Sequence, residues 1–206
     1  AKSVILALGS EYKKLGLKEE KAYSGKGVSY CATCDGFFFK DKEIVVVGGG
    51  DSAATEALFL ARFGTTVHVI HRRDELRASK IMADRLLANE KVQMHWNYRV
   101  VDLAGEGKLE SVTLEDTVTG EHTELPASGL FVAIGHEPRS AVVSAQVNVD
   151  ESGYIVTDEP STATNVPGVF ACGDVVDHHY RQAITAAGSG CKAALDAQAY
   201  LEALED

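Results

Sequence analysis

Three consecutive glycines, placed between an apolar run and an alanine-rich run, limit the fold of this chain more than any other feature. Residues 43–47 form an apolar run typical of a buried strand, and residues 48–53 read Gly-Gly-Gly-Asp-Ser-Ala, which fits the pattern G-x-G-x-x-A. Residues 52–63 then place alanine and leucine at helical spacing, which predicts an amphipathic helix. A strand, a glycine turn and a helix in this order are typical of a dinucleotide-binding site.

The residues of this turn have distinct expected roles. Gly48 permits the tight turn, Gly50 lets the backbone approach a pyrophosphate, and Ala53 lets the helix pack closely on the strand. Asp51 and Ser52 open the helix, whose free N–H groups attract phosphate. The alternative is a plain glycine-rich turn. A second match at residues 188–193 follows no strand and lies in a helical run, so it does not predict a nucleotide site.

The rest of the chain predicts an α/β fold. Further strands are expected at 3–7, 66–70 and 92–96, and helices at 78–89 and 181–204. The βαβαβ order predicts a Rossmann-like, doubly wound parallel sheet. Residues 99–103, 109–116 and 121–125 predict an antiparallel insertion, which returns to the sheet at 129–133, and short strands are expected at 154–156 and 169–171. Residues 11–27 are interpreted as a connection, and 135–138 as a domain crossing.

The end of the second strand indicates which nucleotide is bound. NAD sites place an acid there, but this chain has His71, Arg72 and Arg73, with Arg77 one turn later. Guanidinium groups suit a 2′-phosphate, so the sequence favours NADPH over NADH. The alternative is a solvated run of charge.

The four cysteines include one C-x-x-C pair, Cys31 and Cys34, followed by Asp35. Two intervening residues at a helix start bring the sulfurs within disulfide reach, and Asp35 adjoins them as a proton carrier. A zinc site needs a second such pair, and Cys172 and Cys191 are isolated, so we expect redox chemistry, no metal, and two small core residues. The three phenylalanines at 37–39 are expected to be buried.

Composition excludes several classes of function. The chain of 206 residues has a net charge of −10, which disfavours nucleic acid as a partner. Its apolar runs are shorter than the roughly 18 residues of a membrane span, so no membrane partner is expected. The chain opens without a secretory leader, which predicts a cytoplasmic location.

The order C-A-T-C-D-G, G-G-G-D-S-A, H-R-R-D-E-L-R-A, A-C-G-D-V and R-Q-A closely resembles the low-molecular-weight, bacterial-type thioredoxin reductases. The resemblance implies an NADPH domain at 14–136, inserted into a three-layer FAD-binding domain of which 1–13 and 137–206 form part. That family begins with a strand and a glycine turn for FAD, which are expected before Ala1.

The resemblance also implies site residues. NADPH is expected at the residues named above and at Ile134 and Gly135. The implied FAD contacts are Gly9, Gly173, Asp174, Arg181, Gln182 and Ala183. The family usually has A-T-G at residues 7–9, and Leu8 departs from this motif.

By the same resemblance, electrons pass from NADPH through FAD to the disulfide, and then to thioredoxin. Cys34 lies against the flavin, Cys31 attacks the partner, and Asp35 donates the proton. The full-length protein is expected to be a homodimer whose NADPH domain rotates about crossings near 11–15 and 135–139.

Two alternatives stay open. The flavoprotein reductase of the alkyl hydroperoxide system shares the C-x-x-C-D-G, but it generally prefers NADH. The other alternative is an NADP-binding module with a dithiol and no flavin or turnover. Ferredoxin-type reductases of this fold lack the C-x-x-C, so the sequence disfavours them.

Overall fold

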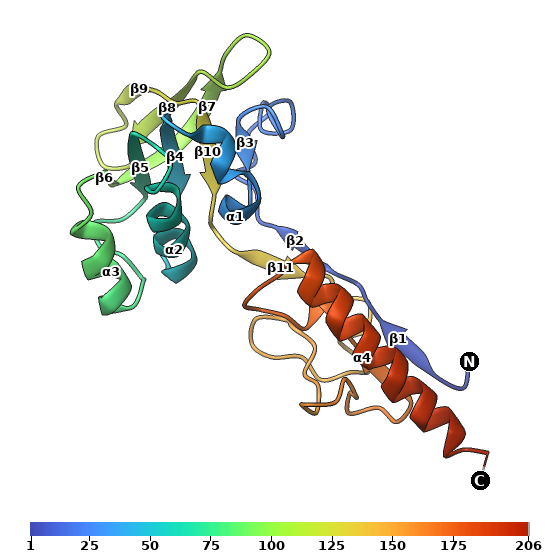
Figure 1. The fold of residues 1–206 in the computed structure, drawn as a ribbon. Coiled ribbons are helices and arrows are strands. Elements are labelled where there is room, and N and C mark those ends of the chain that lie inside the picture. Colours follow the sequence, from blue (N-terminus) through green and yellow to red (C-terminus); the bar gives the residue numbers. More distant parts are fainter. Residues whose placement is uncertain (206) are drawn as a thin grey trace. The chain divides into compact units, whose positions relative to one another are not determined.

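The computed structural model describes residues 1–205, and its elements are labelled in Figure 1. The chain divides into two compact units. One consists of residues 1–11 together with the chain from residue 136 onward, and the other is the continuous stretch Tyr12–Gly135. Each unit is described by itself.

The unit Tyr12–Gly135 is built on a sheet of five parallel strands. In sheet order these are β3 (Val28–Ser29), β10 (Gly129–Val132), β4 (Glu43–Val47), β5 (Thr66–His71) and β6 (Val92–Trp96). Helix α2 (Asp51–Leu60) connects β4 to β5, and α3 (Lys80–Leu87) connects β5 to β6. The short helices α1 (Ala32–Asp35) and η1 (Gly36–Phe39) follow β3.

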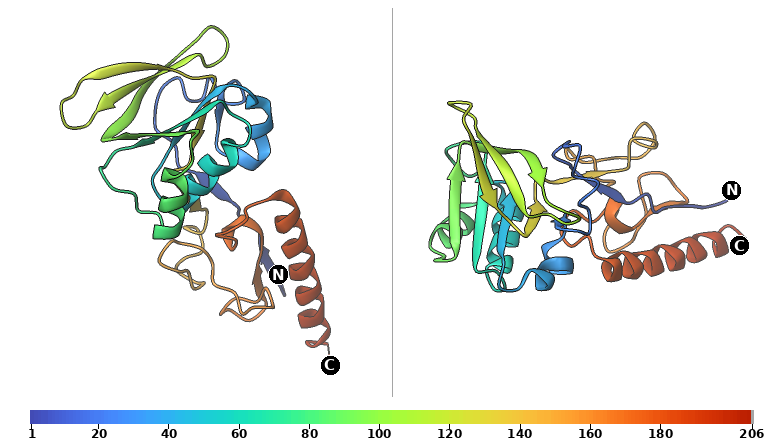
Figure 2. Two further views of the ribbon diagram at one scale, coloured as in Figure 1. Left: turned by 60° about the vertical axis from the view of Figure 1, so that its left-hand side comes forward. Right: turned by 90° about the horizontal axis from the view of Figure 1, so that it is seen from above.

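Different layers cover the two faces of this sheet (Figure 2). On one face Ile44 and Val46 of β4 pack against α2 and α3. On the other face Val45 and Val47 pack against the antiparallel strands β7 (Tyr98–Ala104), β8 (Ser111–Asp116) and β9 (His122–Pro126). Ile44, Val45 and Val46 are fully buried. A strand covered on both faces must be apolar at consecutive positions, which explains the run before the glycines.

The other unit is smaller and less regular. Strand β1 (Val4–Leu6) pairs in parallel with β12 (Val169–Ala171), and β2 (Ser10–Tyr12) pairs with β11 (His136–Pro138). The 3-10 helix η2 (Gly173–Val175) precedes the long helix α4 (Ala183–Glu202). Val147, Ile155, Ala171 and Val175 form the core. No helix within residues 1–205 has the length and apolar character needed to cross a membrane.

The predicted α/β fold with a parallel sheet is confirmed, but several local expectations are wrong. Residues 154–156 form no strand, because Ile155 makes only an isolated bridge to Val149. The helix expected at 52–63 spans Asp51–Leu60, and the connection 11–27 begins inside β2. Of the other two cysteines, Cys172 is buried as expected, but Cys191 is exposed on α4.

The expectation of three buried phenylalanines also fails. Phe39 packs edge-on against Phe131 of β10, with ring centroids 5.2 Å apart. Phe37 and Phe38 are instead 69% and 71% exposed. The apolar run therefore contributes one ring to the core and leaves two on the surface beside the C-x-x-C.

One buried and one half-buried imidazole predict that this chain loses stability in acid. His68 of β5 is 5% exposed, and its Nδ1 atom lies 3.1 Å from Nε2 of His95 on β6. Burial lowers the pKa of both side chains below the ordinary 6.5, and the neighbouring His68 lowers that of His95 further. Below pH 6.5 these two side chains therefore bind more protons in the unfolded chain than in the folded one. Their contribution to the free energy of unfolding is fully present above pH 6.5 and is lost as the pH falls. Between about pH 7.5 and 5.5 we therefore expect the free energy of unfolding in urea to fall.

The control for this effect is His122, whose side chain is 58% exposed. His122→Gln is expected to keep the pH dependence, whereas His95→Gln is expected to reduce it. A free energy of unfolding that stays constant over this range contradicts the interpretation.

Candidate functional site

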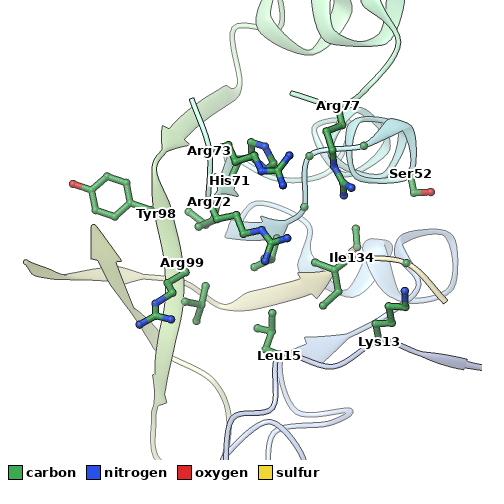
Figure 3. Close-up of a pocket in the computed structure, with 18 of the residues that line it drawn as sticks. Lys13, Leu15, Ser52, His71, Arg72, Arg73, Arg77, Tyr98, Arg99 and Ile134 are labelled. Atoms are coloured by element: carbon green, nitrogen blue, oxygen red, sulfur yellow. The ribbon is translucent and has the colours of Figure 1, made fainter. Parts of the chain in front are cut away.

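A cavity of about 850 Å³ opens at the carboxyl edge of the parallel sheet in the unit Tyr12–Gly135 (Figure 3). Its walls are the ends of β4, β5 and β10 and the start of α2. Nearly all of the residues expected to hold a nucleotide line it: Gly48, Gly50, Asp51, Ser52, His71, Arg72, Arg73, Arg77, Ile134 and Gly135. The structure therefore brings together segments that are far apart in the sequence, at the edge of a parallel sheet where ligands bind.

The glycine turn has the close approaches that require glycine. Gly48 has φ +156°, and a Cβ there would collide with the carbonyl oxygen of Ala133 and the methyl group of Ala53. Ala53 lies beneath the turn and is 1% exposed, so it packs the helix and does not line the cavity. Gly50 has open space where a Cβ would stand and is the N-cap of α2. A phosphate group can therefore approach the backbone at this position.

His71 supports the glycine turn from below. Its ring fills the space that a Cβ of Gly49 would need, and its Nε2 donates to the carbonyl oxygen of Glu75 at 2.9 Å. The Gly49 carbonyl in turn accepts from the N–H groups of Arg77 and Ala78, at 2.7 and 3.1 Å. Burial is the largest influence on the pKa of His71 and lowers it, so the ring is neutral at pH 7. The glycine turn and the arginine segment are thus one connected structure.

The cavity carries a strong positive charge. Six of the residues that line it are basic: Lys13, Lys14, Arg72, Arg73, Arg77 and Arg99. The acid that lines it, Asp51, already accepts from the N–H and hydroxyl of Ser79, at 2.8 Å each. Figure 3 shows Arg72, Arg73 and Arg77, in the segment that follows β5, with their guanidinium groups directed into the cavity. Within residues 1–205 these three guanidinium groups form no ion pair, so they are available to an anionic ligand.

Sequence reasoning missed part of the wall. Lys13 and Lys14 lie in the segment interpreted as a connection, and Tyr98 and Arg99 lie on β7 of the insertion. Arg99 is held by both oxygens of Glu115, at 2.8 and 3.0 Å. The two adjacent lysines were the available signal, because basic pairs are uncommon in an acidic chain.

The same unit contains a disulfide between Cys31 and Cys34, whose Cα atoms are 5.3 Å apart. Cys31 is the N-cap of α1, and the N–H of Cys34 donates to its sulfur at 3.2 Å. Ala32, 2% exposed, fixes this short helix against the core, while Cys34 is exposed. The prediction that the spacing brings the sulfurs within bonding reach is confirmed. Within residues 1–205 no group of three or more potential ligand side chains is arranged to hold a metal ion.

Asp35 and two exposed aromatic residues follow the disulfide closely in the sequence. One oxygen of Asp35, Oδ2, accepts a hydrogen bond of 2.6 Å from the hydroxyl of Ser29. Phe37 and Phe38 come after Gly36 and are mostly exposed to solvent. The disulfide therefore lies at the surface beside a carboxylate and an exposed apolar patch.

A second cavity, of about 480 Å³, lies in the other unit. The six residues that the resemblance assigned to FAD line it: Gly9, Gly173, Asp174, Arg181, Gln182 and Ala183. Gly190 also lines it, and the neighbouring Ser189 accepts a hydrogen bond of 3.0 Å from the Gly173 N–H. The second glycine-rich match is therefore part of α4, as expected, but it contributes to a cavity that sequence reasoning did not assign to it.

The polar groups of this cavity have a fixed arrangement. Burial raises the pKa of Asp174, the charge of Asp177 adds to this, and Arg181 opposes it. Arg181 has φ +49°, a conformation held by Asp177, whose carboxylate accepts from the Arg181 N–H at 2.8 Å. The wall thus offers one carboxylate and one guanidinium group to a ligand.

Comparison with known proteins gives the class of protein that this fold and these sites define. Residues 1–190 match the family model described as pyridine nucleotide-disulphide oxidoreductase. The chain belongs to the pyridine nucleotide-disulphide oxidoreductase family.

Individual relatives are more specific. The chain is 60% identical over 206 residues to a thioredoxin reductase of Streptomyces clavuligerus, covering all of this chain and 64% of that protein. It is 52% identical to a bifunctional thioredoxin reductase/thioredoxin of Mycobacterium leprae, covering 98% of this chain and 44% of that protein. A crystal structure of a Streptococcus pyogenes thioredoxin reductase has a TM-score of 0.91 and 42% identity, over 98% of this chain and 66% of that one. The resemblance found in the sequence is confirmed, and the chain spans between 44% and 66% of the length of these three relatives.

Proposed function

We propose that this chain belongs to an NADPH-dependent flavoprotein that reduces the disulfide of thioredoxin. The observation that carries the proposal is that one compact unit holds both a cationic nucleotide cavity and a surface disulfide. The names of the relatives support thioredoxin as the substrate, and in the Mycobacterium leprae protein the two activities are named together.

The residues of the larger cavity fit NADPH. The open face of Gly50 and the start of α2 suit the pyrophosphate. Arg72, Arg73 and Arg77 supply free guanidinium groups for a 2′-phosphate. The acids at positions 74 and 75 do not line the cavity. This charge favours NADPH over NADH.

The residues of the smaller cavity fit part of FAD. Gly9 and Gly173 have φ +73° and +74°, which favour glycine. A Cβ at Gly9 would meet no atom within 4 Å, and a Cβ at Gly173 would meet only the methyl group of Ala186, at 3.8 Å. Asp174 offers a carboxylate to ligand hydroxyls, and Arg181 offers a donor. We infer that these residues are the share of the FAD site that this chain contributes.

When bound, NADPH and FAD supply a hydride and relay two electrons to the disulfide. The Cys31–Cys34 bond opens to a dithiol. Cys31 loses its proton to solvent and attacks one sulfur of the partner disulfide as a thiolate, which forms a mixed disulfide. The second partner sulfur leaves as a thiolate and takes up a proton from solvent. Cys34 then attacks the sulfur of Cys31, which restores the disulfide and leaves the partner with two thiols. Asp35 accepts the proton that Cys34 loses and delivers it to the departing thiolate.

The exposed rings beside the disulfide are proposed to bind thioredoxin. Burial of one phenylalanine ring contributes about 1.5 to 3 kcal/mol when complete. Phe37→Ala and Phe38→Ala are therefore each expected to raise the KM for thioredoxin about tenfold, with kcat and the affinity for NADPH unchanged. Val118→Ala is the control, because Val118 is 76% exposed on a hairpin of the insertion. Equal KM values for the wild type and both phenylalanine variants contradict this assignment.

We also infer from the resemblance that the full-length protein is a cytoplasmic homodimer. The net charge of −10 supports the absence of nucleic acid as a partner.

A titration of the chain with NADPH, in the presence and absence of FAD, tests the proposed function. Binding of NADPH with or without FAD, together with tight retention of FAD, supports the flavoprotein. NADPH binding without FAD retention indicates that this chain alone is the nucleotide and dithiol module. Failure to bind NADPH contradicts the proposal.

A further inference from the structure

The buried hydroxyl of Ser29 connects the two ends of the disulfide segment. Ser29 closes β3 and is 4% exposed. Its Oγ accepts a hydrogen bond of 3.1 Å from the N–H of Cys31, and it donates one of 2.6 Å to Oδ2 of Asp35. The Cys31 carbonyl oxygen lies farther from the hydroxyl, at 3.5 Å. One side chain thereby holds the residue that begins the C-x-x-C and the carboxylate that follows it.

The position of this hydroxyl is fixed by the sheet. Val28 and Ser29 pair in parallel with Leu130 and Phe131 of β10, both of which are fully buried. β10 also pairs with β4 on its other side. Since buried, paired strands are among the most rigid parts of a fold, Ser29 holds Asp35 in a position set by the core.

We propose that Ser29 is a positioning residue for the disulfide chemistry, whose hydroxyl holds Oδ2 of the ionised Asp35 carboxylate and leaves Oδ1 to exchange a proton with Cys34. This inference rests on the role that the proposed function gives to Asp35. The hydroxyl occupies Oδ2 and fixes the direction of the carboxylate, so Oδ1 is the oxygen that stays open to the thiol. A carboxylate held at one oxygen also loses less freedom when the other oxygen meets the thiol.

The test uses a reaction that needs neither a nucleotide nor thioredoxin. The 206-residue chain is reduced, freed of reductant and mixed with excess oxidised glutathione. One thiolate attacks glutathione disulfide, which forms a mixed disulfide and releases one glutathione. The second thiol loses its proton and attacks the mixed disulfide, which closes Cys31–Cys34 and releases a second glutathione. Two electrons and two protons pass to two glutathione molecules, and acid quenching with mass spectrometry resolves each species.

Three variants are compared with the parent in a Cys191→Ser background, which removes the exposed thiol of α4. Ser29→Ala removes the hydroxyl, and Ser29→Thr keeps it. Ser111→Ala is the matched control, because the Ser111 hydroxyl, in a residue 9% exposed, donates to Glu124 at the same 2.6 Å on the distant antiparallel sheet.

We expect the mixed disulfide to accumulate in Ser29→Ala, with its closure about tenfold slower near pH 6 and approaching the parent rate near pH 8. Ser29→Thr and Ser111→Ala are expected to close like the parent. The first step, attack on glutathione, is expected to be unchanged.

Closure of Ser29→Ala at the parent rate throughout this pH range overturns the inference. So does an equal slowing of Ser29→Thr, or a slowing that does not vary with pH, since either indicates packing and not the hydroxyl. Because the reaction contains neither thioredoxin nor NADPH, its outcome is independent of whether the proposed substrate and cofactor are right.

Discussion

Replacement of Arg72 and Arg73 by alanine is expected to weaken the binding of NADPH about a hundredfold to a thousandfold, while the Kd for NADH changes by about twofold or less. A hydrogen bond to a charged group contributes about 1.5 to 3 kcal/mol, and each 1.4 kcal/mol is about tenfold in affinity. Both guanidinium groups line the cavity and form no ion pair within residues 1–205, so their loss removes favourable contacts and leaves no partner charge unpaired. NADH lacks the 2′-phosphate that they would contact.

The measurement is a pair of titrations, with NADPH and with NADH, on the parent chain and the double variant. Arg62→Ala is a suitable control, since Arg62 lies beyond the end of α2 over the ring of Phe59 and does not line the cavity. Equal losses of affinity for both nucleotides contradict the assignment of these arginines to the 2′-phosphate.

Replacement of Cys34 by serine is expected to stop the reaction with thioredoxin at the mixed disulfide. In the proposed sequence Cys31 attacks the partner and Cys34 releases it, so the variant forms the first bond and cannot break it. The probe is a thioredoxin that keeps one active-site cysteine, activated as an aromatic mixed disulfide. Attack by Cys31 releases the aromatic thiolate, which is followed by absorbance, and leaves a covalent adduct.

The matched variant is Cys31→Ser, and both variants carry Cys191→Ser to remove the exposed thiol on α4. We expect a stoichiometric adduct with Cys34→Ser and at most a few per cent with Cys31→Ser (roughly the reactivity of a weakly positioned thiol). An adduct with Cys31→Ser alone contradicts the proposed order of attack. No adduct with either variant contradicts thioredoxin as the partner.

The sequence was sufficient to predict the parallel sheet because its strands meet a simple physical condition. Residues 44–47 of β4 are buried on both faces, so these four consecutive positions are all apolar. Gly48 must be glycine because a Cβ would strike Ala133 and Ala53. Such requirements are local and leave a clear pattern. The disulfide was predictable for the same reason, because a spacing of three residues at a helix start determines the distance between the sulfurs.

Other features depend on tertiary contacts that have no local pattern. Residues 37, 38 and 39 are all phenylalanine, so the sequence does not distinguish them. In the structure Phe39 packs against a ring of β10, whereas Phe37 and Phe38 are exposed. Likewise, Lys13 and Arg99 come to line the same cavity as the glycine turn only once the chain is folded. The packing of the His71 ring against Gly49 is a further case. The sequence shows that the segment at the end of the strand is basic, but it does not show in which direction one imidazole points.

We propose that the Cys31–Cys34 pair passes electrons to thioredoxin. The most direct test mixes an excess of the reduced chain with oxidised thioredoxin in the absence of nucleotide and flavin, quenches the mixture with acid, and counts the thiols on each protein. We expect thioredoxin to gain two thiols while Cys31–Cys34 closes at the same rate. Thioredoxin that stays oxidised, while the same reduced chain is readily closed by oxidised glutathione, would contradict this proposal.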